Sequence, residues 1–124
     1  MNNRFILKNL MLTLILGFCT LSLSAANFVV TSTDDSGAGT LRQAVIDALA
    51  NGDVTDDITF DIGTDGTPIV LATQITINLA AGEELSITGN GITTTTIDGD
   101  ANSRIFNITT GGIVNIESLT ITNG

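Results

Sequence analysis

The sequence predicts a mostly β fold built from repeated short strands, with a single helix near its N-terminal end. Two observations lead to this prediction. After residue 52 the chain consists of short runs rich in Ile and Thr that are broken by Gly, Asn or Asp, and no helical periodicity recurs there. Before that point, the stretch "SGAGTLRQAVIDALANG" (36–52) carries a complete helix pattern with a start signal and a stop signal.

The first 26 residues have the three-part layout of a secretory signal peptide. Arg4 and Lys8 form a short basic start, an apolar run follows at 10–18, and small residues close the segment at 24–26. We predict that residues 1–26 are a signal peptide cleaved after Ala26, which makes the mature protein secreted or cell-surface. An uncleaved membrane anchor is the less favoured alternative, because the apolar run is short for a span of ~20 residues.

Removal of this segment leaves a strongly acidic chain without cysteine. Cys19 is the only cysteine, and the bulky Phe18 before it disfavours a lipoprotein signal. The remainder keeps all 13 acidic residues but only Arg42 and Arg104 as basic ones, a net charge of 2 − 13 = −11. Such a surface repels nucleic acid and anionic lipid headgroups. Without disulfides, an exported chain must obtain its stability from packing or bound ions.

The elements after the leader begin with a strand and a helix. "NFVVTST" (27–33) is a β-prone run, and "DDSGAG" (34–39) is typical of a loop. The spacing of Thr40 and Gln43 predicts a capping box at the start of a helix over 40–51. Asn51-Gly52 is a typical helix end. One helical face is apolar and comprises Leu41, Ala44, Val45, Ala48 and Leu49.

The helix is too short to be stable alone, so its apolar face must cover another part of the protein. The strand runs can supply that surface, because several of them alternate aliphatic with polar residues at period 2. These predicted runs are "DITFDIG" (57–63), "PIVLATQITINLA" (68–80), "ELSITGNG" (84–91), "TTTIDGD" (94–100), "RIFNIT" (104–109) and "GIVNIESLTITNG" (112–124).

Two of these runs, "ELSITGNG" (84–91) and "SLTITNG" (118–124), look like variants of one unit, which favours a repeat architecture. A β-sandwich or Greek key is the competing interpretation. Antiparallel pairing is disfavoured because Asn90-Gly91 is the only candidate for a two-residue hairpin. A βαβ fold is disfavoured because no second helix pattern appears.

The segments "VVTSTDDSGAGTLRQAVIDALANG", "TTIDGDANSRIFNI" and "GGIVNIESLTITNG" closely resemble the N-terminal region of secreted right-handed parallel β-helix proteins, including CSLREA-type surface proteins and polymorphic outer-membrane adhesins. The resemblance runs from about residue 28 to 124. It implies a right-handed parallel β-helix (solenoid) start with a capping helix at about 40–51. It divides the chain into a strand and capping helix at 27–56 and a truncated set of first coils at 57–124.

The resemblance also implies a function. We expect an exported, non-catalytic scaffold of the adhesin type, associated with the outer membrane, that meets a surface ligand or polysaccharide. The alternative is the N-terminal part of a polysaccharide lyase or glycoside hydrolase whose active site lies in later coils. A lyase needs a base and a nearby cation, and no such pair is evident here. We therefore expect no catalytic residue, cofactor or metal ligand in this stretch.

Two acidic segments are candidate ligand sites. Asp98-Gly99-Asp100-Ala101-Asn102 resembles the start of a calcium loop, but Ser103 and Thr109 stand where the turn glycine and the bidentate Glu belong. We expect an ordinary turn, with calcium binding by Asp98, Asp100 and Asn102 left open. The second segment is predicted to be a solvated loop and strand edge; it consists of Asp53, Asp56, Asp57 and Asp61.

Three further expectations concern single residues. Arg42 is expected to pair with Asp34 and Asp35 and so tether the loop to the helix. Asn107-Ile108-Thr109 matches a glycosylation sequon but lies within a predicted strand. Packing is expected to bury Leu41, Val45 and Leu49 of the helix, and to point Leu119 and Ile121 into a core whose open edge supports self-association.

Overall fold

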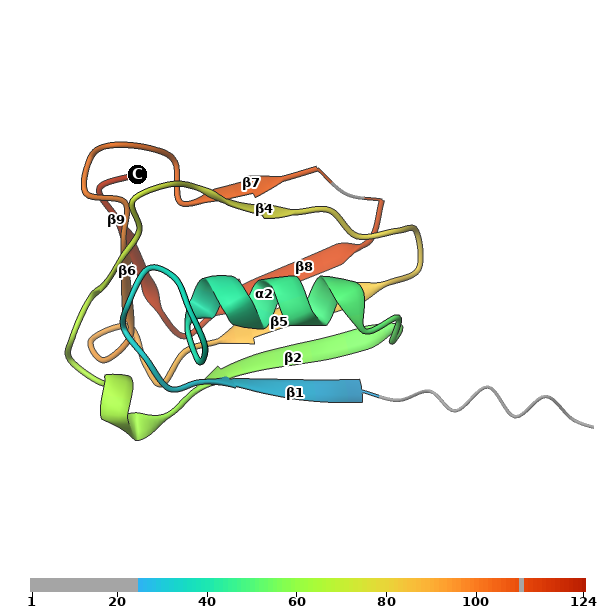
Figure 1. Ribbon diagram of the computed structural model, residues 1–124, viewed down its shortest axis with the longest axis horizontal. Helices are drawn as coiled ribbons and strands as arrows, with labels where there is room; N and C mark the ends of the chain where they lie inside the picture. Colours follow the sequence, from blue (N-terminus) through green and yellow to red (C-terminus); the bar gives the residue numbers. More distant parts are fainter. Residues whose placement is uncertain (1–24, 110) are drawn as a thin grey trace, which may run out of the picture.

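The structure is a computed structural model that describes residues 25–109 and 111–124 (Figure 1). The predicted signal peptide lies outside these residues, apart from Ala25 and Ala26 at the start of the first strand. The elements in chain order are β1 (Ala25–Val30), α2 (Leu41–Ala50), β2 (Thr55–Phe60), a 3-10 turn (Ile62–Thr64), β3 (Ile69–Val70), β4 (Ile75–Ile77), β5 (Glu84–Thr88), β6 (Thr96–Asp98), β7 (Phe106–Ile108), β8 (Ile113–Glu117) and β9 (Thr120–Thr122).

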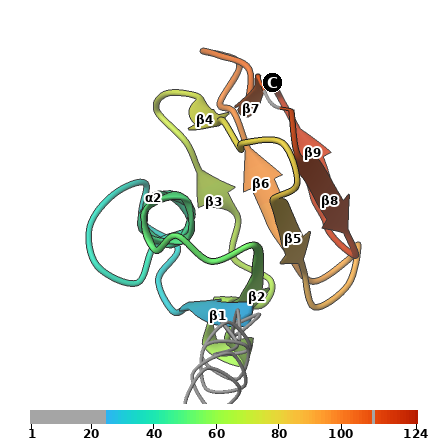
Figure 2. The same ribbon diagram turned by 90° about the vertical axis from the view of Figure 1, so that its right-hand side faces the viewer.

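The strands form three sheets in which every described pair is parallel. Sheet A has the order β1-β2-β5-β8, sheet B has β3-β6-β9, and sheet C has β4-β7. The complete passes β2-β3-β4 and β5-β6-β7 visit the sheets in the order A, B, C, so one pass is one coil, and successive coils stack (Figure 2). This is a β-solenoid-like arrangement. It confirms the mostly β prediction and the stacking of repeated strands, and it is not a sandwich of hairpins.

The register of sheet A reveals the length of one coil. Thr55 pairs with Glu84, and Glu84 pairs with Ile113, so each step spans 29 residues (84 − 55 and 113 − 84). The corresponding steps in sheet B differ, because Ile69 pairs with Ile97 and Ile97 with Ile121, which are 28 and 24 residues apart. The connecting loops absorb the difference. The repeat is therefore structural, with only weak identity of sequence.

The prediction that 84–91 and 118–124 are copies of one unit is wrong. The strand that stacks on Glu84–Thr88 is Ile113–Glu117 in sheet A, whereas Thr120–Thr122 stacks on Thr96–Asp98 in sheet B. The two look-alike runs therefore occupy different sides of the coil. Their likeness has a simple physical cause, since every strand of a solenoid needs the same alternation of inward aliphatic and outward polar residues.

Two predicted runs are each divided into two strands. The run at 68–80 contains β3 and β4, and the run at 112–124 contains β8 and β9. In the second run the corner falls at Ser118, which has a φ of 57° in the left-handed region. A corner of this kind turns the chain from sheet A to sheet B without a glycine, which is why the run reads as continuous in the sequence.

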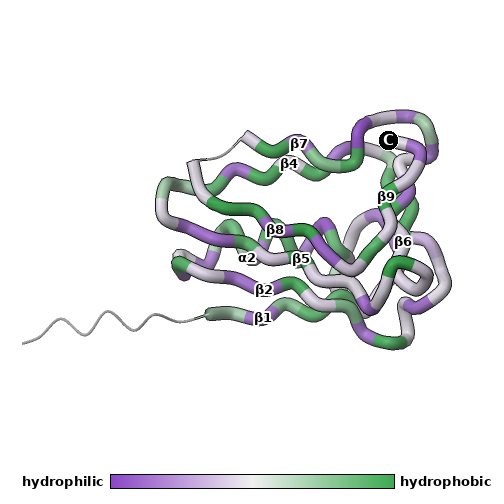
Figure 3. The backbone as a smooth tube through the Cα atoms, turned by 180° about the vertical axis from the view of Figure 1, so that it is seen from behind, coloured by the Kyte–Doolittle hydropathy of each residue, from purple (hydrophilic) through white to green (hydrophobic). Residues whose placement is uncertain are grey.

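The core lies between the three sheets and consists of aliphatic ladders. Ile58 stacks on Ile87 in sheet A, and Ile69 stacks on Ile97 in sheet B, all fully or almost fully buried. Figure 3 shows the alternation of hydrophobic and hydrophilic residues along the strands that produces these ladders. Because identical or similar aliphatic residues occupy equivalent positions on neighbouring strands, each side chain packs against its counterpart one strand away.

Helix α2 packs against β1, β2 and β4, at the end of the stack opposite to β8 and β9 (Figure 2). The side chains that it buries include Leu41, Ala44, Val45 and Ala48, as the periodicity predicts. Leu49 packs against the core as predicted but is only partly buried, at its edge. The helix thus closes one apolar end of the stack, which solenoids require.

The ends of α2 follow the predicted signals with one difference. Thr40 is the N-cap, and its hydroxyl accepts a hydrogen bond from the Gln43 backbone N–H at 3.2 Å. The reciprocal half of the capping box is absent, because the Gln43 side-chain amide donates to Asp47 at 2.8 Å instead. Asn51 is the C-cap, and Gly52 follows with the positive φ of 79° that favours glycine after a helix.

Strands β8 and β9 lie at the edge of sheets A and B in the part of the chain that the structure describes. Their inward residues are correspondingly less covered. Ile121 is 49% exposed, although Ile97, its partner one coil earlier, is fully buried. Val114, Ile116 and Leu119 are likewise only partly buried. The expectation that Ile121 lies in the core is therefore correct in its strand register, because Ile121 pairs with the buried Ile97, but wrong in its burial.

No helix among the described residues is long and apolar enough to cross a membrane.

Candidate functional site

The broadest candidate surface is the outer face of sheet A, where polar side chains align from strand to strand. Asn27, Asp57, Ser86 and Asn115 occupy one row, one residue per strand. Two hydrogen bonds link neighbouring strands across this face: Thr59 Oγ1 donates to Asn27 Oδ1 at 3.1 Å, and Asn115 Nδ2 donates to Glu84 Oε1 at 2.8 Å. We call this surface the sheet A outer face; its polar residues are Asn27, Thr55, Asp57, Thr59, Glu84, Ser86, Thr88, Asn115 and Glu117.

The polar side chains of the sheet A outer face are hydroxyls, amides and carboxylates, with no basic side chain, and the exposed Val29 and Ile113 add two aliphatic positions to the same face. Because successive strands lie ~4.8 Å apart, these groups repeat at that spacing along the stack. Such a face can donate and accept hydrogen bonds to a hydroxyl-rich ligand, and its carboxylates disfavour anions.

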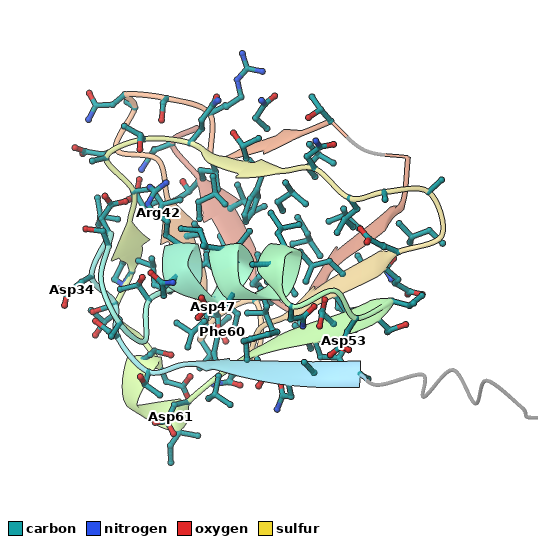
Figure 4. The ribbon with its side chains drawn as sticks, turned by 45° about the vertical axis from the view of Figure 1, so that its right-hand side comes forward. Asp34, Arg42, Asp47, Asp53, Phe60 and Asp61 are labelled. Atoms are coloured by element: carbon teal, nitrogen blue, oxygen red, sulfur yellow. The ribbon has the colours of Figure 1, made fainter. Side chains whose placement is uncertain are left out.

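Arg42 holds the helix, the preceding loop and the next coil together (Figure 4). Its guanidinium donates to the Asp35 carboxylate at 2.6 Å and to the Asp35 carbonyl at 3.1 Å. Two more bonds reach the carbonyls of Thr73 and Gln74 at 2.7 and 3.0 Å, in the corner between β3 and β4. The expected pairing with Asp35 is confirmed. Asp34 instead accepts a hydrogen bond from Ser32 at 2.9 Å.

This arrangement satisfies four hydrogen bonds from one planar cation, which leaves Arg42 little capacity for a ligand. Asp35 is also shared, because its carboxylate accepts the backbone N–H of Ala72 at 3.2 Å. The cluster, which we call the cap clamp, comprises Asp35, Arg42, Ala72, Thr73 and Gln74. Its contacts are those of a structural tether between the capping helix and the first full coil.

The segment from Asp98 to Asn102 forms a tight turn after β6. Asp98 Oδ1 accepts the backbone N–H of Asp100 at 2.8 Å and the Asn123 side-chain amide at 3.0 Å. Asn102 donates to Asp100 at 3.0 Å, and Asp100 and Ala101 both have positive φ, 51° and 55°. The side-chain oxygens are thus engaged in the turn and in its contact with the next coil. The expected turn is present, and the bond from the Asp100 N–H to the Asp98 side chain makes it an Asx turn.

The predicted cluster of Asp53, Asp56, Asp57 and Asp61 is wrong as a single solvated group. Asp57 is exposed on the sheet A outer face, and Asp61 caps the 3-10 turn by accepting the Gly63 N–H at 2.8 Å. Asp53 and Asp61 flank opposite ends of β2 and lie well apart in Figure 4. Asp56 points inward, because strand alternation places it on the same side as the buried Ile58, and it is only 3% exposed.

Asp56 therefore replaces an aliphatic residue in a core ladder, between Ala26 of β1 and Leu85 of β5. Asn51 Nδ2 donates to Asp56 Oδ1 at 2.6 Å. Burial raises the pKa of the Asp56 carboxyl above its usual value, and the charges of Asp53 and Glu83 raise it further. Hydrogen bonds from Asn51 and from the backbone N–H of Ala26 act in the opposite direction. The period-2 pattern of β2 was the signal that could have identified this inward carboxylate from the sequence.

The remaining candidate is the sequon at Asn107, which lies in β7 as expected. Asn107 pairs with Thr76 of β4 and is partly buried, and its side-chain oxygen accepts a 3.4 Å hydrogen bond from Arg104.

Within residues 25–109 and 111–124, no three His, Cys, Asp or Glu side chains are grouped closely enough to hold a metal ion. No family model, curated protein or solved structure matches the chain.

Proposed function

We propose that this chain is the N-terminal portion of an exported, right-handed parallel β-helix that serves as a non-catalytic scaffold of the adhesin type at the cell surface. The observation that carries the proposal is the stack of parallel coils behind a capping helix, in a chain that opens with a signal-peptide pattern. The resemblance of "SGAGTLRQA" and its flanks to such surface proteins supports the same assignment.

The stack is suited to presenting a long surface outside the cell. Each coil adds one strand to sheet A and therefore one residue to each polar row, so the rows lengthen with the number of coils without a change in the core. The described coils contain no disulfide and depend on aliphatic ladders and on the cap clamp. The net charge of −11 for residues 27–124 favours solubility and disfavours anionic ligands.

The ligand that this surface fits best is a hydroxyl-rich, uncharged one, such as a neutral polysaccharide. Hydroxyl and amide side chains in register offer repeated hydrogen bonds, and the absence of Lys and Arg on this face argues against an acidic polysaccharide as the partner. We propose weak contacts of this kind that gain strength by repetition along the coils.

Export is tested by producing the full chain, with a C-terminal epitope tag, in a Gram-negative host beside a control that lacks residues 1–26. The proposal predicts that the full chain reaches the periplasm or cell surface with Asn27 as its N-terminal residue, and that the control stays in the cytoplasm. N-terminal sequencing of the exported material is the measurement. An intact Met1 on all of the product would refute the export step.

Ligand binding is tested with insoluble neutral and acidic polysaccharides. The purified chain should be retained by a neutral polymer and not by an acidic one. Replacing Ser86 and Thr88 with Ala should reduce retention, whereas the same change at Thr76, on the outer face of sheet C, should not. Equal retention of both variants, or the appearance of new reducing ends during incubation, would contradict a non-catalytic binding role for this face.

A further inference from the structure

The buried carboxylate of Asp56 has no role in the proposed surface, and its position calls for a physical account. The side chain lies where three elements meet: the C-terminal end of α2, the start of β1, and β2 itself. Asn51, which donates to it, is the C-cap of α2. A residue at this point can couple the end of the capping helix to the first strands of the stack.

Burial and the neighbouring charges favour the neutral form of Asp56, and they outweigh the hydrogen bonds from Asn51 and the Ala26 backbone N–H, which favour the charged form. β5 presents the aliphatic Leu85 and β1 presents Ala26, neither of which carries a charge. The charged side chains that face it from the neighbouring loops are Asp53 and Glu83, both acidic. The C-terminal end of a helix adds partial negative charge. The two arginines of the described chain are engaged elsewhere, Arg42 in the cap clamp and Arg104 beside Asn107.

We propose that Asp56 and Asn51 form an acid-strengthened latch that holds the C-terminal end of the capping helix onto the first strands of the stack. In acid the protonated side chain can be buried without a charge and still accept the hydrogen bond from Asn51. Once the carboxyl loses its proton, the same position holds an anion among other negative groups, with no cation beside it, and the latch is weaker.

The direction in which pH changes the stability of the latch follows from proton linkage. The folded chain binds a proton at Asp56 more tightly than the unfolded chain does, so acid favours the folded latch. The stabilisation is complete below the unfolded pKa of about 3.8 and is lost as the pH rises through the raised folded pKa. Because a single proton is involved, the equilibrium constant for local opening can change by at most about tenfold per pH unit.

Hydrogen exchange of the full chain, followed by mass spectrometry between about pH 4 and about pH 7, tests the latch once rates are corrected for intrinsic exchange. Protection of peptides covering 27–30 and 46–56 should fall as the pH rises. Asp56→Asn should abolish this fall, and the matched control Asp57→Asn, which removes the same charge from the exposed outer face, should retain it. Protection that is independent of pH, or an equal response of both variants, would overturn the proposal.

A second measurement covers the case in which Asp56→Asn fails to fold. Carbon NMR of the wild-type chain can follow the Asp56 carboxyl directly through its titration. We expect a midpoint above the ordinary Asp value, and a further upward shift in Asn51→Ala, because the Asn51 hydrogen bond favours the charged form. A midpoint at or below the ordinary value would overturn the proposal, whatever the outcome of the export experiment.

Discussion

The capping role of α2 predicts graded costs when its aliphatic side chains are truncated. Leu41 is fully buried at the first position of the helix, Leu49 is partly buried, and Ile46 is 51% exposed on the opposite face. These three residues have the same number of carbon atoms and share one helix. Substitution of each with Ala therefore compares burial at nearly constant chemistry, and Ala itself is the best helix former.

The magnitudes follow from the buried surface. Leu41→Ala removes three carbon atoms from a dry site, which costs about 2.4 kcal/mol at about 0.8 kcal/mol per buried methylene. The cavity that remains raises this to about 3–4 kcal/mol. Leu49→Ala should cost about half as much, because its side chain is only partly covered. Ile46→Ala should lie within about 0.5 kcal/mol of the wild type.

Urea unfolding followed by circular dichroism measures these differences as shifts of the midpoint at constant slope. The order Leu41, Leu49, Ile46 is the expected result. Equal costs at Leu41 and Ile46 would refute the packing of α2 against the coils. A change in slope without a change in midpoint would indicate an altered denatured state, and the comparison would then rest on hydrogen exchange of α2.

Two further predictions concern the cap clamp and the sheet edge. Arg42→Lys should destabilise the chain by about 1–2 kcal/mol, because one ammonium cannot bind the Asp35 carboxylate and the Thr73 carbonyl in the same fixed geometry. The control is Arg104→Lys at an exposed site, whose free energy of unfolding in the same urea assay should stay within about 0.5 kcal/mol of the wild type. The polypeptide 27–124 should self-associate through the edge formed by β8 and β9. The association should be stronger at high salt, because salt screens the net charge of −11. A folded monomer at both low and high salt in sedimentation velocity would contradict this prediction.

Much of the fold could be predicted from local patterns. The Thr40 cap, the apolar face of α2 and the Asn51-Gly52 end are short-range signals, and the structure contains all three. The strand runs were predictable for the same reason, since alternation is visible over a few residues. The pairing of strands was not, because each inward position of a solenoid accepts any branched aliphatic residue and so carries little information about its partner.

The contacts at the candidate sites likewise separate into those that sequence patterns predict and those that depend on the pairing of strands. The Asx turn at Asp98 and the Arg42–Asp35 pair involve residues close in sequence, and both were expected. The bonds from Arg42 to Thr73 and Gln74 span about one coil and could not be inferred without the register. Asp56 was misassigned because three other acidic residues lie nearby in the sequence, and composition outweighed the strand alternation that buries it.

The central claim is that successive coils stack in parallel with the register of sheet A, and engineered cysteine pairs test it most directly. In a Cys19→Ser background, Thr59→Cys combined with Thr88→Cys places two thiols on neighbouring strands, whereas Thr59→Cys combined with Glu117→Cys places them two strands apart. Neighbouring Cα atoms lie ~4.8 Å apart, within the disulfide range, and the second pair lies about twice as far. Mild oxidation should link the first pair and leave the second unlinked; the reverse pattern, or no linkage of either pair in folded protein, would contradict the stacked coils.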